Sequence, residues 1–316
     1  ISSFAIIHGY LVIRYYPRFH SYLRNKNAMS LAATYGAGRF GLSFELFPPK
    51  TRQGEAALLR HVRELVTCQP SFISCTYGAG GSTRTQTLEV IKQVKERFHV
   101  PMASHLTCVD STVDQLRSYL ATAQQAGVDY IVALRGDPPS GETVFRSPAN
   151  GLRHASELVS LIKAEFPGFG IAVAGYPEVH REALSREEDL QHLKHKVHMG
   201  ADVVITQLFY HNDDFLRFRD RYQAAGIRVP LVPGILPVNN LSQIQRISSM
   251  CGATLPPAFV EKLSARDDPQ WQYQVGVEFA ARQVRELVQC GVPGIHFYVL
   301  NKSQSTLAVL QAVSQL

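Results

Sequence analysis

Glu45 is the side chain whose surroundings in this sequence most directly suggest chemistry. It lies in LSFELFPP, with apolar residues on both sides. A carboxyl group buried among apolar side chains has a raised pKa unless it is paired, and we expect this of Glu45. A carboxyl group that stays protonated can serve as a general acid. The alternative is a structural glutamate that pairs with a lysine or arginine.

Further polar side chains lie at or just beyond the ends of later apolar runs. Arg135, Gly136 and Asp137 follow one run, and Gln207 lies near the end of another. Charged, amide, hydroxyl and imidazole groups so placed exceed what solubility requires, and they indicate a binding or catalytic site. The other members of this set are Thr76, His105, Thr107, Tyr176, His180, Asn301 and Lys302.

The elements that must position these side chains alternate regularly along the chain. Eight apolar, β-favouring runs are each followed by an amphipathic, helix-favouring segment. The predicted strands cover 42–47, 71–77, 101–107, 130–135, 171–176, 203–209, 231–236 and 294–300. The predicted helices cover 54–68, 83–97, 112–126, 152–165, 186–199, 213–224, 240–250 and 303–315, with an additional pair at 256–264 and 270–290.

Eight consecutive strand-and-helix units predict an α/β fold of the (β/α)8 TIM-barrel type. A doubly wound open sheet is the alternative, but the series contains no midpoint or linker. We assign residues 40–316 to a single barrel domain. Residues 1–39 form an N-terminal extension that is expected to be poorly ordered, and Met29 is a candidate for the functional start. Active sites of such barrels lie at the C-terminal ends of the strands, where the polar set falls.

The composition limits the classes of protein that need to be considered. With 316 residues, 45% of them hydrophobic and 18% charged, the chain is expected to be globular and soluble, with a large core. The net charge of +6 comes mostly from residues 1–44, which hold five basic and no acidic residues, so the barrel gives no reason to expect a nucleic acid partner. No stretch is apolar enough for a membrane span. Five scattered cysteines without C-x-x-C spacing predict neither disulfides nor a zinc site.

Three local patterns imitate ligand-binding motifs. Residues 36–41 match G-x-G-x-x-G, but they precede a strand where a dinucleotide-binding loop would follow one. Residues 76–83 (TYGAGGST) lie between a strand and a helix and could offer backbone N–H groups to an anion, or form only a glycine-rich turn. His192, His195 and His198 drift around a helix that also carries lysines, so we expect a solvated face and no metal site.

Nine motifs, in order along residues 40–316, resemble the methylenetetrahydrofolate reductase family. They are LSFELFPPK, TYGAGGSTR, SHLTCVD, ALRGDPP, VAGYPEVH, DLQHLKHKVHMGAD, ITQLFY, PGILPV and HFYVLNK. The resemblance is to the short, bacterial-type catalytic barrel. It implies non-covalent flavin adenine dinucleotide (FAD), with NADH or NADPH as hydride donor. It further implies ping-pong transfer that reduces 5,10-methylenetetrahydrofolate to 5-methyltetrahydrofolate for methionine synthesis.

The resemblance also implies roles for single residues. Glu45 matches the general acid that protonates the folate so that its five-membered ring opens. Asp137 matches the acid beside the flavin, which tunes flavin reduction and stabilises the cationic folate intermediate. The positions that match FAD contacts are Thr76, His105, Arg135, Gly136, Asp137, Tyr176, His180, Asp189 and Lys196. The positions that match folate contacts are Glu45, Gln207, Gln243 and Lys302.

Two positions depart from the family pattern. Ile247 stands where bacterial relatives place a phenylalanine that stacks on the substrate and the nicotinamide. Lys302 stands where many relatives have an arginine, so the charge is kept but the bidentate fork is lost.

The resemblance carries expectations about the whole protein as well. It implies a homodimer or homotetramer in the cytoplasm, with the folate and a nicotinamide nucleotide as partners. It also implies a barrel without the S-adenosylmethionine-binding domain of eukaryotic members. Two alternatives stay open from the residues: another FAD-dependent barrel oxidoreductase, similar to the proline dehydrogenases, or a non-catalytic barrel that only binds.

Overall fold

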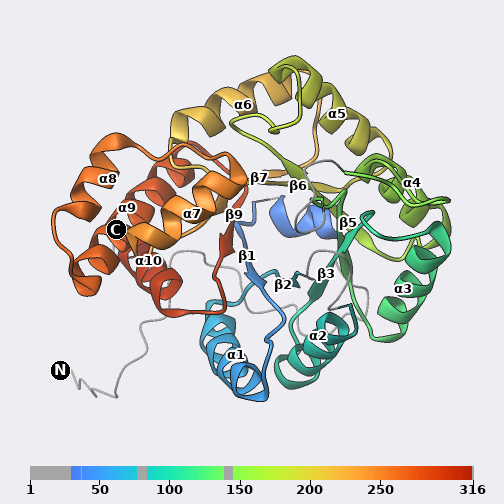
Figure 1. Cartoon of the computed structure of the whole chain (residues 1–316), viewed down its shortest axis with the longest axis horizontal. Helices are drawn as coiled ribbons and strands as arrows, with labels where there is room; N and C mark the ends of the chain where they lie inside the picture. Colours follow the sequence, from blue (N-terminus) through green and yellow to red (C-terminus); the bar gives the residue numbers. More distant parts are fainter. Residues whose placement is uncertain (1–29, 37, 77–83, 139–144, 315–316) are drawn as a thin grey trace, which may run out of the picture.

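Parallel strands form the centre of the molecule, and helices cover the outside (Figure 1). The computed structural model describes residues 30–36, 38–76, 84–138 and 145–314. The strands are β1 (Gly41–Leu46), β2 (Phe72–Cys75), β3 (Met102–Thr107), β4 (Tyr130–Leu134), β5 (Gly170–Gly175), β6 (Val203–Thr206), β7 (Leu231–Val232), β8 (Gly234–Ile235) and β9 (Gly294–Tyr298). The α-helices are α1 (Arg52–Leu65), α2 (Arg84–Phe98), α3 (Val113–Gln125), α4 (Ala155–Glu165), α5 (Arg186–His198), α6 (Asn212–Ala224), α7 (Leu241–Cys251), α8 (Pro257–Ser264), α9 (Pro269–Gln289) and α10 (Gln304–Ser314).

The nine strands follow the order β7-β6-β5-β4-β3-β2-β1-β9-β8, and all pairings are parallel. β7 pairs with β6 at one end of this order, and β8 pairs with β9 at the other. Because only Pro233 separates β7 from β8, the two ends of the sheet meet and the barrel is nearly closed. The predicted TIM-barrel fold is confirmed.

The predicted strand over residues 231–236 is the one that the structure divides. Pro233 has no N–H to donate to a neighbouring strand, so regular pairing stops there. Its carbonyl still accepts a hydrogen bond from the His296 N–H, at 3.0 Å. Gly234 is needed at this point because a Cβ would lie 2.2 Å from the carbonyl oxygen of Thr206 on β6. The seventh strand therefore changes partner from β6 to β9 within five residues.

Each predicted helix is present, with ends that shift by at most three residues. Side chains that accept backbone N–H groups mark several beginnings, including Thr51 before α1, Thr112 before α3 and Ser185 before α5. The helices pack apolar faces onto the outside of the barrel, and the core there contains fully buried residues such as Leu58, Ile91 and Leu120.

A short 3-10 helix, η1 (Leu31–Tyr35), lies beneath the barrel and closes its N-terminal end (Figure 1, blue). Leu31 and Tyr35 are each 1% exposed and pack with Phe72, Tyr130 and Val132 inside the ring of strands. We had assigned these residues to a poorly ordered extension, and for residues 30–36 that expectation is wrong. The apolar pattern of LAATY is too short to be recognised as a barrel element from the sequence.

Within the residues that the structure describes, no helix is long and apolar enough to cross a membrane.

Candidate active site

Glu45 lies on the inner face of β1 and is held between two histidines from other strands. Its Oε2 is 3.2 Å from Nε2 of His105 on β3 and 3.7 Å from Nε2 of His296 on β9. The residue is buried, with 7% of its surface exposed. This placement follows from the strand period of two, because Ser43 and Glu45 point to the same side of β1. The neighbouring strand presents His296 beside Ser43 and Tyr298 beside Glu45.

The electrostatic state of Glu45 differs from the one expected. Burial alone would raise the pKa of Glu45, but interactions with the neighbouring imidazoles, His105 before His296, outweigh it and hold the pKa at about 2. The prediction of burial is right, and the prediction of a raised pKa is wrong. The partner that the sequence reasoning considered was lysine or arginine, whereas the fold supplies imidazoles. Glu45 is therefore a carboxylate at neutral pH.

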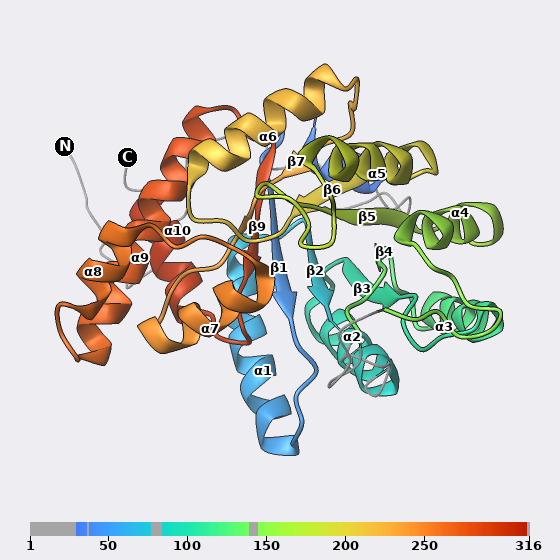
Figure 2. The same ribbon diagram turned by 45° about the horizontal axis from the view of Figure 1, so that its top comes forward.

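The contact with His296 continues away from Glu45 toward the barrel floor. Nδ1 of His296 is 2.7 Å from Oγ of Ser43, and that oxygen is 2.6 Å from the hydroxyl of Tyr35 in η1. All three side chains are buried. Figure 2 shows β1 and β9, which carry this chain of contacts, side by side through the middle of the molecule.

A second group of polar side chains lies at the ends of β4 and β5. Arg135 makes a bidentate ion pair with Glu182, with N–O distances of 2.5 and 2.6 Å. Its guanidinium group also lies 5.0 Å from the centre of the Phe145 ring. Gly136 has a φ of +89°, and a Cβ there would lie 2.7 Å from Val109, so only glycine fits. After this turn Asp137 is exposed.

The side chains that follow β5 are packed more closely. The rings of Tyr176 and His180 meet edge to face with centroids 4.7 Å apart. Asp189 in α5 is buried and accepts the backbone N–H of His180 at 3.2 Å. Nζ of Lys196 donates to the carbonyl of Ala174 at 2.6 Å, and burial lowers the pKa of Lys196 to about 8.

The groups on β1 and on β4–β5 face one common region at the mouth of the barrel. The thiol of Cys251, at the end of α7, has its pKa raised by burial and then by the charges of both Asp137 and Glu45. Burial and the charge of Glu45 likewise raise the pKa of Tyr298, which is also influenced by Tyr176. The thiol of Cys251 is thus near enough to both acids to be affected by the charge of each.

The residues expected to hold folate lie on the β6, α7 and β9 side of the mouth. Gln207 is half-buried at the end of β6, with its side-chain oxygen accepting the Leu208 N–H at 2.9 Å. Gln243 is half-buried in the first turn of α7, and Ile247 follows on the same helix face, packed among apolar residues.

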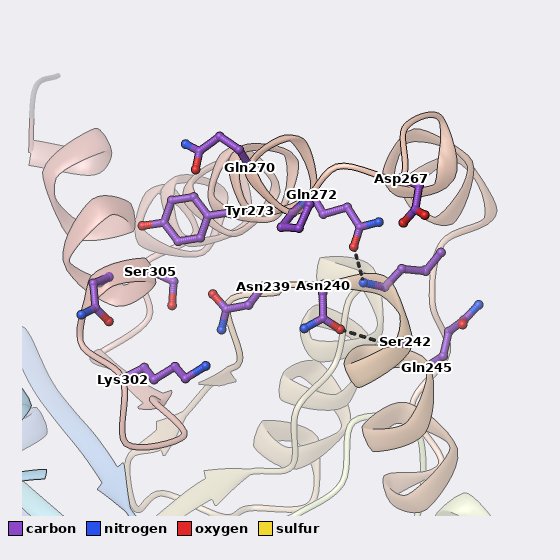
Figure 3. A pocket seen from close by; sticks show the side chains of 13 residues that line it. Asn239, Asn240, Ser242, Gln245, Asp267, Gln270, Gln272, Tyr273, Lys302 and Ser305 are labelled. Carbon is purple, nitrogen blue, oxygen red and sulfur yellow. Dashed lines mark hydrogen bonds between the residues drawn. The ribbon is translucent and has the colours of Figure 1, made fainter. Parts of the chain in front are cut away.

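Lys302 is exposed and lines a cavity of about 750 Å³ between the start of α7, the start of α9 and the turn after β9. In Figure 3 its side chain lies across one end of this cavity, on the side opposite Gln270 and Tyr273. Neither Glu45 nor Asp137 lines the cavity. The cavity is therefore lined by Lys302 but by neither of the two acids singled out from the sequence.

Comparison with known proteins identifies the family. The family model of methylenetetrahydrofolate reductase matches residues 30–314. This chain belongs to the methylenetetrahydrofolate reductase family. It is 41% identical to the 5,10-methylenetetrahydrofolate reductase of Pectobacterium carotovorum subsp. carotovorum over 292 residues, which cover 92% of this chain and 95% of that protein. The Escherichia coli K12 enzyme of the same name is 40% identical, with 92% and 96% covered. The predicted family and the predicted class, an oxidoreductase, are confirmed.

Among solved structures the fold is similar to that of an uncharacterized protein from Clostridium thermocellum that binds two copies of 5-methyl-5,6,7,8-tetrahydrofolic acid. The TM-score is 0.59 with 13% sequence identity, over 87% of this chain and 94% of that one. At this identity the likeness supports the barrel fold of this reductase family member and nothing finer.

The polar side chains on the β4–β5 side fit the FAD that the family implies. FAD carries two phosphate charges, and the ammonium group of Lys196 is held by a carbonyl, with no ion pair recorded for it among the described residues. A cation whose pKa is lowered by burial is stabilised when an anion binds beside it. Thr76, half-buried at the end of β2, adds a hydroxyl next to residues 77–83, which lie outside the described residues.

Two residues of this reductase family member that sequence reasoning did not single out help to shape the site. His296 was only part of the HFYVLNK motif, although its spacing of two from Tyr298 places both on the inner face of β9. Asn301 was noted only as polar. Its side-chain amide donates to the Phe47 carbonyl and its oxygen accepts the Phe47 N–H, both at 2.8 Å. Asn301 thereby ties the chain after Glu45 to the turn that carries Lys302.

Proposed function

We propose that this chain catalyses the reduction of 5,10-methylenetetrahydrofolate to 5-methyltetrahydrofolate, using NADH or NADPH and bound FAD. Family membership supports the reaction type. The observation that carries the assignment of its centre is Glu45, a buried carboxylate between His105 and His296 at the mouth of the barrel.

Residues from β2 to α5 are proposed to hold FAD. Arg135 and Lys196 supply positive charge for the phosphates, and Thr76, Tyr176 and His180 supply hydroxyl, aromatic and imidazole groups. His105, Gly136, Asp137 and Asp189 complete the set that matches the family. When bound, FAD supplies a carrier that accepts a hydride from the nicotinamide and gives it to the folate.

Glu45 and His105 are proposed to deliver the proton that the folate needs. Opening of the five-membered ring breaks a C–N bond, and the departing nitrogen must gain a proton as the bonding pair returns to it. With the pKa of Glu45 near 2, the proton is stored on the imidazole side of the pair. Glu45 passes that proton to the nitrogen, and the pair recovers it from water after release. The remaining methylene iminium then accepts the hydride and becomes a methyl group.

Asp137 is proposed to stabilise the positive charge of that iminium. The residue is exposed, and its charge contributes to raising the pKa values of Arg135, Tyr176 and Cys251. In water an exposed charge is strongly screened, but a bound ligand that displaces water restores its strength. Asp137 therefore acts mainly in the loaded site.

Gln207, Gln243 and Lys302 are proposed to position the folate. The two glutamines can bind polar edges of the pterin from β6 and α7, and Lys302 can bind a carboxylate of the folate tail. The cavity beside Lys302, which Asn239, Ser242 and Tyr273 also line, gives the tail a direction away from Glu45 (Figure 3).

The remaining expectations are part of the same proposal. A role in supplying methyl groups for methionine synthesis follows from the product. A homodimer or homotetramer in the cytoplasm follows from the family. These stay predictions.

The proposed reaction is tested by its two halves, measured without oxygen. Protein loaded with FAD is mixed with NADH or NADPH, and bleaching of the flavin absorbance is followed by stopped flow. The reduced protein is then mixed with 5,10-methylenetetrahydrofolate, and we expect the absorbance to return as 5-methyltetrahydrofolate forms. A flavin that neither nucleotide bleaches, or that no folate reoxidises, would contradict the proposal.

A further inference from the structure

The ring of Tyr35 fills a slot in the barrel floor beside two glycines. Gly41 on β1 and Gly294 on β9 are paired in register. A Cβ on Gly41 would lie 2.2 Å from the ring of Tyr35. One on Gly294 would lie 2.1 Å from the carbonyl oxygen of Gly41 and 2.7 Å from the ring. A side chain at Gly41 would expel the ring, and one at Gly294 would clash with the paired strand as well as with the ring.

In this position the hydroxyl of Tyr35 is directed at Ser43 and, beyond it, His296. Oγ of Ser43 lies 2.6 Å from that hydroxyl, and Nδ1 of His296 lies 2.7 Å from the same Oγ. The surroundings of Tyr35 are otherwise aromatic, with Phe72 edge to face at 6.1 Å and Tyr130 packed behind it. Ser43 is the hydrogen-bond partner recorded for Tyr35 among the described residues.

These contacts fix the direction in which the protons point. A buried phenol without another acceptor must donate to Ser43, since an unpaired buried O–H is costly. Ser43 has one proton and, having accepted from Tyr35, donates it to Nδ1 of His296. Nδ1 is then an acceptor, so the proton of His296 is on Nε2, the nitrogen that faces Glu45.

The opposite direction is unfavourable at both ends. If Nδ1 of His296 carried a proton, Ser43 would accept it. Ser43 could then also accept from Tyr35, which leaves its own O–H without an acceptor among the described residues, or donate to Tyr35, which leaves the Tyr35 O–H without one. In the neutral form with Nδ1 protonated, the lone pair of Nε2 would also face the Glu45 carboxylate. At 3.7 Å the Nε2 contact is longer than a hydrogen bond, so its effect on Glu45 is electrostatic and depends on which tautomer is present.

We propose that Tyr35 is a positioning residue for the folate half-reaction, which holds His296 through Ser43 as a neutral imidazole with its Nε2–H directed at Glu45. The two histidines beside Glu45 then differ. His296 is fixed in one protonation state, and His105 is left to carry the mobile proton. The proposal rests on the proposed role of Glu45 in proton delivery.

Other titratable groups act on the same carboxylate and must be considered in a pH experiment. The charge of Glu45 contributes to raising the pKa values of Cys75 on β2, Cys251 on α7 and Tyr298 on β9. Burial raises the pKa values of all three, and Tyr130 is the titratable neighbour of Tyr35. The Tyr35→Phe variant keeps all four of these side chains.

The test compares Tyr35→Phe with Tyr119→Phe in the full, FAD-loaded protein. Tyr119 in α3 has its hydroxyl 2.6 Å from Ser104 Oγ, so the control loses an equal contact to a serine whose own hydroxyl donates to the His105 carbonyl and not to an imidazole nitrogen. We expect Tyr35→Phe to shift the pH profile of the folate half-reaction by about half a pH unit or more, while flavin bleaching stays within about twofold. Tyr119→Phe should leave both unchanged.

Nitrogen NMR of histidine-labelled protein gives a second readout that does not depend on activity. In the wild type His296, assigned by its loss in His296→Gln, should show a bare Nδ1 and a protonated Nε2 from about pH 6 to about pH 8. Tyr35→Phe, and Ser43→Ala as a second break in the chain, should each produce a mixture of tautomers or an imidazolium. An unchanged His296 signal, or a pH profile that matches that of Tyr119→Phe, would overturn the proposal. If the wild type shows no folate half-reaction, the proposed function fails, and the NMR result still decides the role of Tyr35.

Discussion

The two acids of the site, Glu45 and Asp137, lie in opposite environments. Glu45 is buried on β1 between two imidazoles, and they hold its pKa at about 2. Asp137 is exposed after β4 and shares its region with Arg135. Water screens the charge of Asp137 and is excluded from Glu45. Under the proposed function, the β1 side is organised for proton transfer before any ligand arrives, whereas the β4 side needs a bound ligand to become effective.

Among the substitutions considered for the two acids, Glu45→Gln is expected to have the largest effect. The amide keeps the size of the side chain but can no longer exchange a proton with His105, so the folate half-reaction should slow by about a thousandfold. Flavin bleaching by NADH or NADPH should persist. Stopped-flow absorbance measures both rates in one preparation.

A matched control is Glu165→Gln, which removes an exposed carboxylate that pairs with Arg117 on the outer helices. It should leave both half-reactions unchanged. Equal loss of the two half-reactions in Glu45→Gln would mean that Glu45 is needed for the structure of the site and has no separate proton role.

Asp137→Asn should have a smaller effect, confined to the folate half-reaction. Because the residue is exposed, the variant should fold and bind FAD as the wild type does. Loss of the negative charge near the iminium should slow folate reduction by about tenfold to about a hundredfold. Rapid-reaction rates at saturating folate measure this, and wild-type rates would remove Asp137 from the mechanism.

The same two acids show how far the sequence predicts this molecule. The strands and helices follow from apolar runs, caps and terminal glycines, because these are local signals. The burial of Glu45 also follows from its apolar neighbours. Its pKa does not, because the deciding partners are 60 and 251 residues away in the chain and become neighbours only when β1, β3 and β9 pair. The break at Pro233 was readable from proline chemistry, but the change of partner strand was not.

The floor of the barrel is a second region that depends on contacts between distant parts of the chain. Nothing in LAATY marks Tyr35 as a buried residue, and the glycines that receive it are 6 and 259 positions later. A slot formed by two paired strands has no signature in either segment alone. Sequence reasoning therefore assigned Tyr35 to an extension, although it belongs to the chain of contacts that leads to Glu45.

On the β4–β5 side, Lys196→Met should weaken FAD binding by about tenfold. The pKa of Lys196 is lowered to about 8, so its ammonium group loses its proton as the pH rises through this value, and FAD should be held less tightly above about pH 8. The unfolded chain, with a lysine pKa of about 10.4, binds more protons there, so the stability of the FAD-free protein should rise between about pH 8 and about pH 10. Both trends should flatten in the variant.

Release of fluorescent flavin during titration measures the affinity, and thermal unfolding of the FAD-free protein measures the stability. Lys194→Met is the control, because Lys194 is exposed on the same helix. If Lys194→Met weakens FAD binding as much as Lys196→Met does, the effect is one of net charge and the specific contact is disproved.

The smallest effect is expected at the outer edge of the folate side, from Lys302→Arg. Lys302 offers a carboxylate one ammonium group, whereas an arginine offers a planar fork with two parallel hydrogen bonds. The residue is exposed at the rim of the cavity, so the gain is limited by solvent, and KM for folate should fall by about twofold to about fivefold with kcat unchanged. Lys262→Arg, which changes an exposed lysine paired with Glu278, should leave KM unchanged. The gain should vanish for 5,10-methylenetetrahydropteroate, which lacks the glutamate and carries its one carboxylate on the benzoate ring, short of the tail. An equal gain with that substrate would place Lys302 nearer the pterin and the benzoate ring and leave the cavity without a part in holding the glutamate.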